Sequence, residues 1–347
     1  MKTNFFGLTH NQLKEVVVKL GLPAFTGTQL ADWMYKKRVT DFSAMTNLSR
    51  HTREILESQF KIDVNLPSKV QTSIDGTKKY LYPTQTTNFI ESAYIPDQDR
   101  ATLCVSSQIG CKMGCLFCMT GKQGFQGNLS AGEILNQVQS LPEFDKLTNI
   151  VYMGMGEPMD NIDAVLHSIE IMTSNKGYGW SPKRITVSTI GIIPAMVTFL
   201  EKSEAHLAVS LHSPFDDERR QIMPIQNVYP ITEVIREIKR WDLGRQRRIS
   251  FEYIMFKGVN DTVRHATELV KLLNGIKCRI NLIRFHPIPD TPLEGTSEAE
   301  IVSFQNLLKA KGLIVTVRAS RGEDIFAACG LLSTKELIKR QQLKSDF

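Results

Sequence analysis

The sequence predicts an α/β protein built on a parallel sheet. From about residue 100 onward, short apolar runs typical of buried strands alternate with longer stretches of helical periodicity. Chains that alternate in this way form βα units, whose strands pair in parallel. Six such units suit either a partial barrel or an open doubly wound sheet, and periodicity leaves both possibilities open. The predicted strands are 102–106, 149–153, 184–188, 205–211, 249–255 and 279–284. The predicted helices are 131–141, 162–174, 192–201, 231–241 and 263–273, and a strand at 313–318 and a helix at 333–342 follow.

The chain before residue 100 has a different pattern. Its first part is predicted to be helical, because apolar side chains recur at helical spacing. Between 62 and 95 the pattern favours short strands, with Asp75-Gly76 as a tight turn. We therefore expect an N-terminal helical domain over 1–60, a β-rich linker over 61–98, and a core domain with a C-terminal extension over 99–347.

The composition is that of a globular enzyme without a membrane anchor. Of the 347 residues, 42% are hydrophobic and 22% are charged. No apolar run approaches the length of a membrane span, and the N-terminus lacks the apolar region of a secretory signal. We therefore expect a cytoplasmic protein with no membrane association. The net charge of +6 is compatible with a polyanionic partner but does not require one.

Four of the six cysteines lie close together, between 104 and 118. In a long chain without a secretory signal, such crowding indicates metal or redox chemistry rather than disulfides. Cys111, Cys115 and Cys118 have the spacing C-x3-C-x2-C, and three thiolates on one loop can hold three irons of a cubane cluster while the fourth iron stays open. The alternative is a structural zinc site that borrows Cys104 or a histidine. Zinc sites usually pair two C-x2-C knuckles or add a histidine pair, and neither is nearby, so the cluster is favoured.

Candidate ligand contacts lie at or just after the ends of three successive predicted strands. A glycine in a loop lets the backbone approach a ligand closely, and a carboxylate suits an ammonium group. Each residue alone has a simpler explanation, as a strand-end turn or a helix cap. Together, on successive strands, they favour a cofactor pocket. The candidate cofactor-binding residues are Gly156, Glu157, Ser188, Ser210, Leu211 and His212.

These motifs resemble a known superfamily and one family within it. The cysteine spacing is similar to the signature of radical S-adenosylmethionine (SAM) enzymes, whose open iron binds SAM, and MGMGEP at 153–158 resembles their segment that contacts the SAM amino group. RATLCVSSQIGC at 100–111 and RGEDIFAACG at 321–330 are similar to the RNA adenine C2-methyltransferases known as the RlmN family. The resemblance covers nearly the whole chain. It implies a partial (β/α)6 TIM-like radical SAM barrel with a small N-terminal helical domain and a β-rich linker, with a [4Fe-4S] cluster and SAM as cofactors.

The resemblance also implies a mechanism. Carbon C2 of adenine is not nucleophilic, so methylation there needs radical chemistry from a cofactor. Cys329 first takes a methyl group from one SAM, and a second SAM gives a 5′-deoxyadenosyl radical that abstracts hydrogen from that methyl group. The methylene radical adds to the base, Glu91 accepts the C2 proton, and Cys104 attacks the sulfur, which releases the product and leaves a disulfide. The alternative for Glu91 is an exposed strand carboxylate. His286, where the family often has Asn, is carried over as a SAM contact.

The same resemblance implies the partners. The family acts on one adenosine at the peptidyl-transferase centre of 23S rRNA and on the adenosine 3′ to the anticodon in some tRNAs, so the N-terminal helices are expected to clamp RNA. The cluster needs a reductant such as flavodoxin or ferredoxin, and we expect a monomer. The nearest alternative is the Cfr-like branch, which methylates C8; an iron–sulfur electron-transfer protein and a zinc-stabilised RNA-binding protein are the non-catalytic alternatives. The basic segments expected at the barrel mouth are 36–38, 183–184, 219–220 and 245–248.

Overall fold

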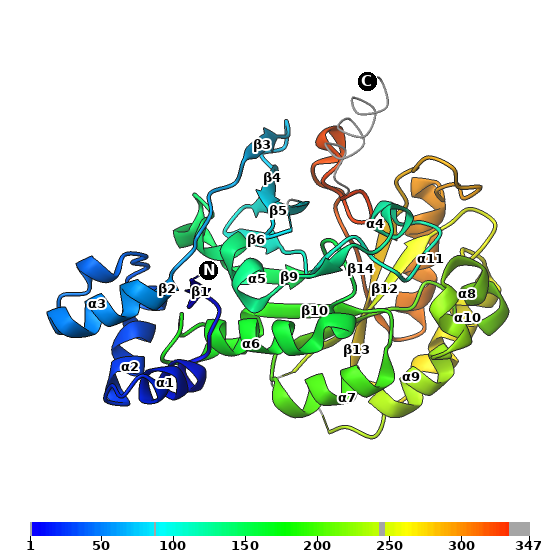
Figure 1. Cartoon of the computed structure of the whole chain (residues 1–347). Helices are drawn as coiled ribbons and strands as arrows, with labels where there is room; N and C mark the ends of the chain where they lie inside the picture. The colour runs from blue at the N-terminus through cyan, green and yellow to red at the C-terminus, as the bar shows by residue number, and fades with distance from the viewer. Residues whose placement is uncertain (1, 87, 243–246, 333–347) are drawn as a thin grey trace.

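The structure is a computed structural model that describes residues 2–86, 88–242 and 247–332 (Figure 1). The predicted helix at 333–342 and the basic residue Arg245 lie outside the described residues. Among the residues described, every helix is too short or too polar to span a lipid bilayer.

A ten-stranded sheet is the centre of the described chain, and its parallel part follows the sequence order without reversal. In a doubly wound sheet the strand order reverses at a switch point. Here each strand is added beyond the previous one, so the connecting helices cover one face and the sheet curls toward a barrel (Figure 1). The sheet ends at β14 and β3, which do not pair in the described chain, so the predicted partial barrel is confirmed.

The strands lie within one or two residues of their predicted positions, and the strand predicted at 313–318 joins the parallel set beside β13. The parallel strands are β6 (Arg100–Cys104), β9 (Asn149–Tyr152), β10 (Ile185–Thr189), β11 (His206–Ser210), β12 (Ile249–Met255), β13 (Cys278–Arg284) and β14 (Ile314–Val317). The helices between them are α5 (Ala131–Gln139), α6 (Ile162–Thr173), α7 (Ile193–Lys202), α8 (Asp216–Ile222), α9 (Ile231–Ile238), α10 (Val263–Leu273) and α11 (Glu298–Ala310). Between β6 and α5 lie the short β7 (Gln108–Ile109), α4 (Met119–Gln123) and β8 (Gly127–Asn128).

Antiparallel strands extend the sheet beyond β6. β5 (Phe89–Asp97) pairs with β6, β4 (Lys78–Pro83) pairs with β5, and β3 (Lys69–Thr72) pairs with β4. They occupy the region predicted to be β-rich, and Gly76, with φ of 84°, lies in the turn between β3 and β4. These strands continue the barrel wall, and we call them the sheet extension.

The N-terminal part is helical, as predicted. It contains α1 (His10–Lys19), α2 (Phe25–Ala31) and α3 (Arg50–Gln59), and its ends meet where β1 (Thr3–Asn4) pairs with β2 (Phe60–Lys61). The part docks on the barrel at Gly7, where an added Cβ would lie 2.3 Å from the backbone nitrogen of Gly132 in α5. Such close backbone contact needs glycine on both sides.

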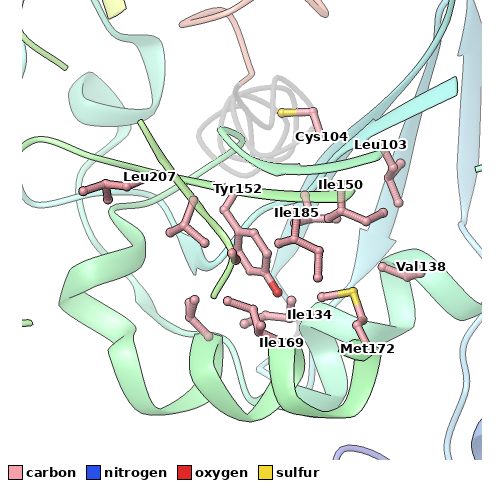
Figure 2. Packing of buried hydrophobic residues seen from close by; sticks show 14 of the residues in the cluster. Leu103, Cys104, Ile134, Val138, Ile150, Tyr152, Ile169, Met172, Ile185 and Leu207 are labelled. Carbon is pink, nitrogen blue, oxygen red and sulfur yellow. The ribbon is translucent and has the colours of Figure 1, made fainter. Parts of the chain in front are cut away.

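Side chains alternate between the two faces of the barrel strands. Ile150 and Ile185 pack with Tyr152 against helices α5 and α6, and the Tyr152 hydroxyl lies 2.6 Å from the Ser168 hydroxyl in α6 (Figure 2). Cys104 points away from this packed layer (Figure 2). Because successive side chains of a strand face opposite sides, the helix-facing layer forms the core and Cys104 faces the barrel interior.

We expect Ile185→Ala to lower the free energy of unfolding by about 2–5 kcal/mol, because Ile185 is fully buried at 0% exposure and the truncation leaves a cavity. Denaturant unfolding measures the loss. Ile314→Ala is the matched control, since Ile314 is 56% exposed at the start of β14 and its truncation should cost less than about 0.5 kcal/mol. Equal losses in the two variants would contradict the placement of the core.

Candidate active site

Three cysteines lie on one loop between β7 and α4, which we call the cysteine loop. Cys111 donates its backbone N–H to the Gly124 carbonyl (3.2 Å), and Cys118 donates its own to the Cys115 carbonyl (3.1 Å). Gly110 has φ of 72°, and a Cβ there would lie 1.7 Å from the Gly124 carbonyl oxygen. Only glycine fits at that position, so the entry to the loop is fixed by sterics.

The donor set of the cysteine loop fits a cubane cluster. Burial raises the pKa of Cys111 to about 12 and that of Cys115 well above its usual value, and repulsion from neighbouring thiolates adds to both shifts. Iron replaces the protons of its thiol ligands and so relieves both costs. Within the described residues, no three His, Cys, Asp or Glu side chains surround the position of a single metal ion. A cubane gives each cysteine its own iron, so its ligands need not converge on one point.

Apolar side chains surround the cysteine loop. They come from the loop itself, from the carboxyl ends of barrel strands and from the segment around residue 330. An apolar shell limits solvent access and so tunes a bound cluster. The buried members include Met113, Phe117, Ile190, Met223, Phe256, Phe285, Ile288, Ala328 and Leu331.

Gly156 and Glu157 form the turn after β9, where the sequence predicts a SAM contact. Gly156 has φ of 98°, and a Cβ there would lie 2.5 Å from the Cβ of Gln108. The Glu157 carboxylate accepts hydrogen bonds from the Thr189 hydroxyl (2.6 Å) and the Ile190 N–H (3.1 Å). Burial raises the pKa of Glu157 to about 7, and these hydrogen bonds oppose the shift. The carboxylate therefore joins the ends of β9 and β10, a role that the sequence does not predict.

Ser188 and Ser210 lie half-buried near the carboxyl ends of the adjacent strands β10 and β11. Strand alternation places both on the face that lines the barrel interior. Leu211 is fully buried, and its carbonyl accepts a hydrogen bond from the guanidinium of Arg219 (3.1 Å). The structure thus places the two serines at the barrel interior, whereas Leu211 packs in the buried core.

His212 is buried next to the cysteine loop. Its Nδ1 accepts the Ile254 N–H (3.0 Å), and its ring meets the Phe117 ring edge-on, with centroids 4.8 Å apart. Burial, and then the charge of Arg219, lowers the pKa of His212 to about 3. The imidazole is therefore neutral, and Nδ1 is the acceptor.

A cavity of about 670 Å³ fills the barrel interior, and both Cys104 and Cys329 line it. Cys104 is buried, whereas Cys329 has exposed surface. Burial, and then the charge of Cys329, raises the pKa of Cys104 to about 12, while the Met153 N–H and Arg318 oppose the shift. The sequence predicts a sulfur pair from residues more than two hundred positions apart, and the fold brings both to one cavity.

The segment around Cys329 is attached to the cysteine loop. Met119 donates its backbone N–H to the Gly330 carbonyl (2.9 Å), and the Thr120 hydroxyl donates to the Leu332 carbonyl (2.7 Å). These two hydrogen bonds therefore hold the chain immediately after Cys329.

The sheet extension holds the chain that leads to this segment. The Gly322 N–H donates to the Asp75 carboxylate (2.9 Å), and Arg321 forms an ion pair with Asp97 (2.8 Å). Although burial raises the pKa of Asp75, hydrogen bonds led by that from Gly322 lower it to about 2. The charged acceptor is thus preserved at every pH near neutrality.

A row of polar side chains crosses the barrel interior, and the sequence analysis missed it. Glu252, Asn281 and Thr316 pair in register across β12, β13 and β14. Asn281 donates to Glu252 (2.8 Å), Thr316 donates to Asn281 (2.6 Å), and Arg318 forms an ion pair with Glu252 (3.4 Å). Against the larger effect of burial, the Arg318 guanidinium lowers the pKa of the Cys104 thiol, and its charge also acts to lower the pKa of Cys329. The available signal was a polar residue inside each apolar strand.

Glu91 and His286 face other parts of the site. Glu91 is 5% exposed, so the alternative of an exposed strand carboxylate is wrong. Its carboxylate forms an ion pair with Lys79 (3.3 Å), and its carbonyl accepts the Ser106 hydroxyl (2.6 Å). His286 is half-buried, lines the cavity with both sulfurs, and lies 3.1 Å from the Ser320 hydroxyl.

Some basic residues predicted at the barrel mouth lie elsewhere. Arg219 is fully buried, and its guanidinium donates to the carbonyls of Ile190 (2.8 Å) and Ser210 (3.0 Å), so the prediction of an RNA contact there is wrong. Lys183 and Arg248 precede β10 and β12 and therefore lie at the amino ends of the strands, opposite the cysteine loop. A charge run in sequence does not reveal which end of a barrel it occupies.

Comparison with known proteins identifies the family of the chain. Residues 105–270 match the model of the radical SAM superfamily, and residues 3–62 match the ribosomal RNA large subunit methyltransferase N-terminal domain. The chain is 58% identical over 333 residues to the Parabacteroides distasonis protein described as "Probable dual-specificity RNA methyltransferase RlmN", covering 96% of this chain and 97% of that protein. A Desulfotalea psychrophila protein described as "Dual-specificity RNA methyltransferase RlmN" is 42% identical, covering 98% and 97%.

A solved structure, that of a radical SAM methyltransferase from Sphaerobacter thermophilus, is 38% identical, with a TM-score of 0.87, and covers 95% of this chain and 99% of that one. The barrel and the cysteine loop define a radical SAM enzyme, whose superfamily uses a [4Fe-4S] cluster and SAM. The level of identity over almost the full length places the chain more narrowly: it belongs to the RlmN family of radical SAM methyltransferases.

We expect Cys111→Ala, Cys115→Ala and Cys118→Ala each to abolish the iron–sulfur absorbance of anaerobically reconstituted protein, because a cubane held by two thiolates is not retained. Cys278→Ala is the control, since Cys278 is half-buried at the start of β13, away from the loop. Iron and sulfide analysis, together with the visible absorption spectrum, measures the cluster content of the loop variants and of the control. Retention of the cluster by a loop variant would contradict the assignment of that ligand.

Proposed function

We propose that this chain methylates carbon C2 of an adenosine in 23S rRNA and in tRNA, with Cys329 as the methyl carrier. The observation that carries the proposal is the meeting of Cys104 and Cys329 at one cavity, with the Cys329 segment hydrogen-bonded to the end of the cysteine loop and the start of α4. An electron-transfer protein needs only the cluster ligands. A second pair of sulfurs beside the cluster loop suits a reaction in which one sulfur carries a group and the other releases it.

The residues that would hold the cofactors are those of the cysteine loop and the adjacent strand ends. Cys111, Cys115 and Cys118 would bind three irons, and the turn at Gly156 and the hydroxyls at the ends of β10 and β11 would contact SAM. When bound, the cluster and SAM supply a carbon radical that can abstract hydrogen from an unactivated methyl group. The apolar shell around the loop excludes water from that reaction.

The residues of the chain divide the remaining work. Cys329, on a segment fixed to the cysteine loop, accepts a methyl group and presents it at the cavity. Glu91 accepts the proton that leaves C2. Cys104 then attacks the Cys329 sulfur and a disulfide forms. The bond from sulfur to carbon breaks with its electron pair on the carbon side, and that carbon takes a proton to become the methyl group. Arg318 favours the thiolate form of Cys104 that this attack requires.

The RNA contact is assigned to the N-terminal helices and the mouth of the barrel. The N-terminal part matches a domain named for ribosomal RNA methyltransferases, and it docks directly on α5. The target base must leave its stack to reach a sulfur inside the barrel. We place the reaction in the cytoplasm, with a flavodoxin or ferredoxin as reductant, a monomeric enzyme and the three-part division at residues 60 and 98.

The decisive measurement is nucleoside analysis of RNA treated with anaerobically reconstituted protein, SAM and reductant. We expect 2-methyladenosine in both 23S rRNA fragments and tRNA transcripts. Exclusive formation of 8-methyladenosine would favour the Cfr-like alternative. Absence of SAM cleavage by protein with a full cluster would overturn the proposal.

Cys104→Ala should retain the cluster and accumulate a covalent protein–RNA adduct, because the bond between Cys329 and the base can then no longer be exchanged. Denaturing gel electrophoresis detects the adduct as a slow-moving band. Cys329→Ala is the control and should give neither adduct nor product, since no sulfur carries the methyl group. Normal turnover by Cys104→Ala would contradict the sulfur-exchange step.

A further inference from the structure

Lys79 forms a buried ion pair with Glu91. The Lys79 Nζ lies 3.3 Å from the Glu91 Oε1, and the two side chains are only 8% and 7% exposed. Lysine is among the residues least often buried, and a buried ion pair is a poor way to gain stability, because desolvation offsets the attraction. The burial of this pair is therefore better explained by a function than by a gain in stability.

The strand register places this pair on the face of the sheet that carries Cys104. Ala93 pairs with Lys79 on one side and with Cys104 on the other, so these three residues share a face. Glu91 lies two residues from Ala93 and shares that face as well. Lys78 lies on the opposite face and pairs with Glu143 (2.7 Å). Lys79 is thus directed to the reaction side of β4.

Burial by itself favours the neutral form of a carboxyl group, and a neutral acid cannot accept a proton. On β4 and β6, the two strands that pair with β5, the titratable side chains on the Glu91 face are Lys79 of β4 and Cys104 and Arg100 of β6. Arg100 lies at the far end of β6, opposite Asp97. Of these groups, Lys79 is the cation in contact with the carboxylate.

We propose that Lys79 is a positioning residue that keeps Glu91 ionised and oriented for removal of the C2 proton. This inference rests on the proposed function. In the step concerned, the C2–H bond breaks, its electron pair remains with the adenine, and the proton moves to the Glu91 carboxylate. Lys79 stays protonated throughout. Its positive charge then favours loss of the newly gained proton from Glu91 to solvent, which restores the Glu91 carboxylate for the next turnover.

The test follows adducts formed on RNA with deuterium at C2 of the target adenosine. In Cys104→Ala the adduct should have lost the deuterium, because proton removal precedes sulfur exchange. In Lys79→Met the adduct should form at the normal rate, decay slowly and retain the deuterium. Mass spectrometry of the digested adduct measures the isotope content, and iron analysis confirms that both variants hold the cluster.

The pH dependence gives a second readout. The acid limb of the rate of adduct decay should move to higher pH by about 1–3 units in Lys79→Met, because an adjacent cation lowers a carboxyl pKa by that amount. Lys79→Arg should restore the normal limb. Lys78→Met is the matched control, since it removes the same charge from the same strand on the other face and should leave both readouts unchanged.

The outcomes separate this inference from the proposed function. If the unaltered protein makes no 2-methyladenosine, the proposed function fails. If it does, and Lys79→Met loses deuterium and follows the normal pH profile, Lys79 has no part in the step. In a Glu91→Gln background, Lys79→Met should slow adduct decay no further, and a further slowing would also overturn the inference.

Discussion

The attachment of the Cys329 segment to the cysteine loop is the contact on which the rest of the site depends. Two hydrogen bonds, from Met119 and Thr120, hold the carbonyls of Gly330 and Leu332. A carrier sulfur must meet the methyl source, the target base and the second sulfur within one reaction. The hydrogen bonds to the loop hold the sulfur in a defined geometry. Holding reacting groups in place in this way is what gives the rate gain from proximity.

The other end of that segment is held by strands that a sequence pattern would describe as a linker. Asp75 in the turn of the sheet extension receives the Gly322 N–H, and Asp97 at the end of β5 pairs with Arg321. The same extension carries Glu91. One structural unit therefore both positions the chain that leads to Cys329, the proposed carrier, and supplies the proposed base, so a shift of the extension would disturb two proposed steps together.

The sequence could predict what local patterns encode. The parallel strands are apolar on the side that packs against the helices, and they lie close to their predicted bounds. The cysteine loop is a single short segment, so the sequence could predict it equally well. Pairings that depend on register could not be predicted in this way: Arg318 meets Glu252 only because β12, β13 and β14 align. The prediction for Arg219 was wrong because two adjacent arginines in the sequence suggest an exposed surface. In the structure the Arg219 guanidinium is buried and donates hydrogen bonds to carbonyls at the strand ends.

Three cations, one just after β14, one on the sheet extension and one on α8, share one feature that composition does not show. Arg318 lies by the two cavity thiols, Arg219 favours the charged form of Cys115, and Lys79 contacts the Glu91 carboxylate. Arg219 and Lys79 are costly to bury, and backbone carbonyls compensate Arg219 while Glu91 compensates Lys79. Arg318 is half-buried and pairs with Glu252. Each also adjoins an atom that bears negative charge in the proposed reaction, as a thiolate, an iron ligand or a proton acceptor. These three cations thus favour negative charge at the positions where the proposed reaction requires it.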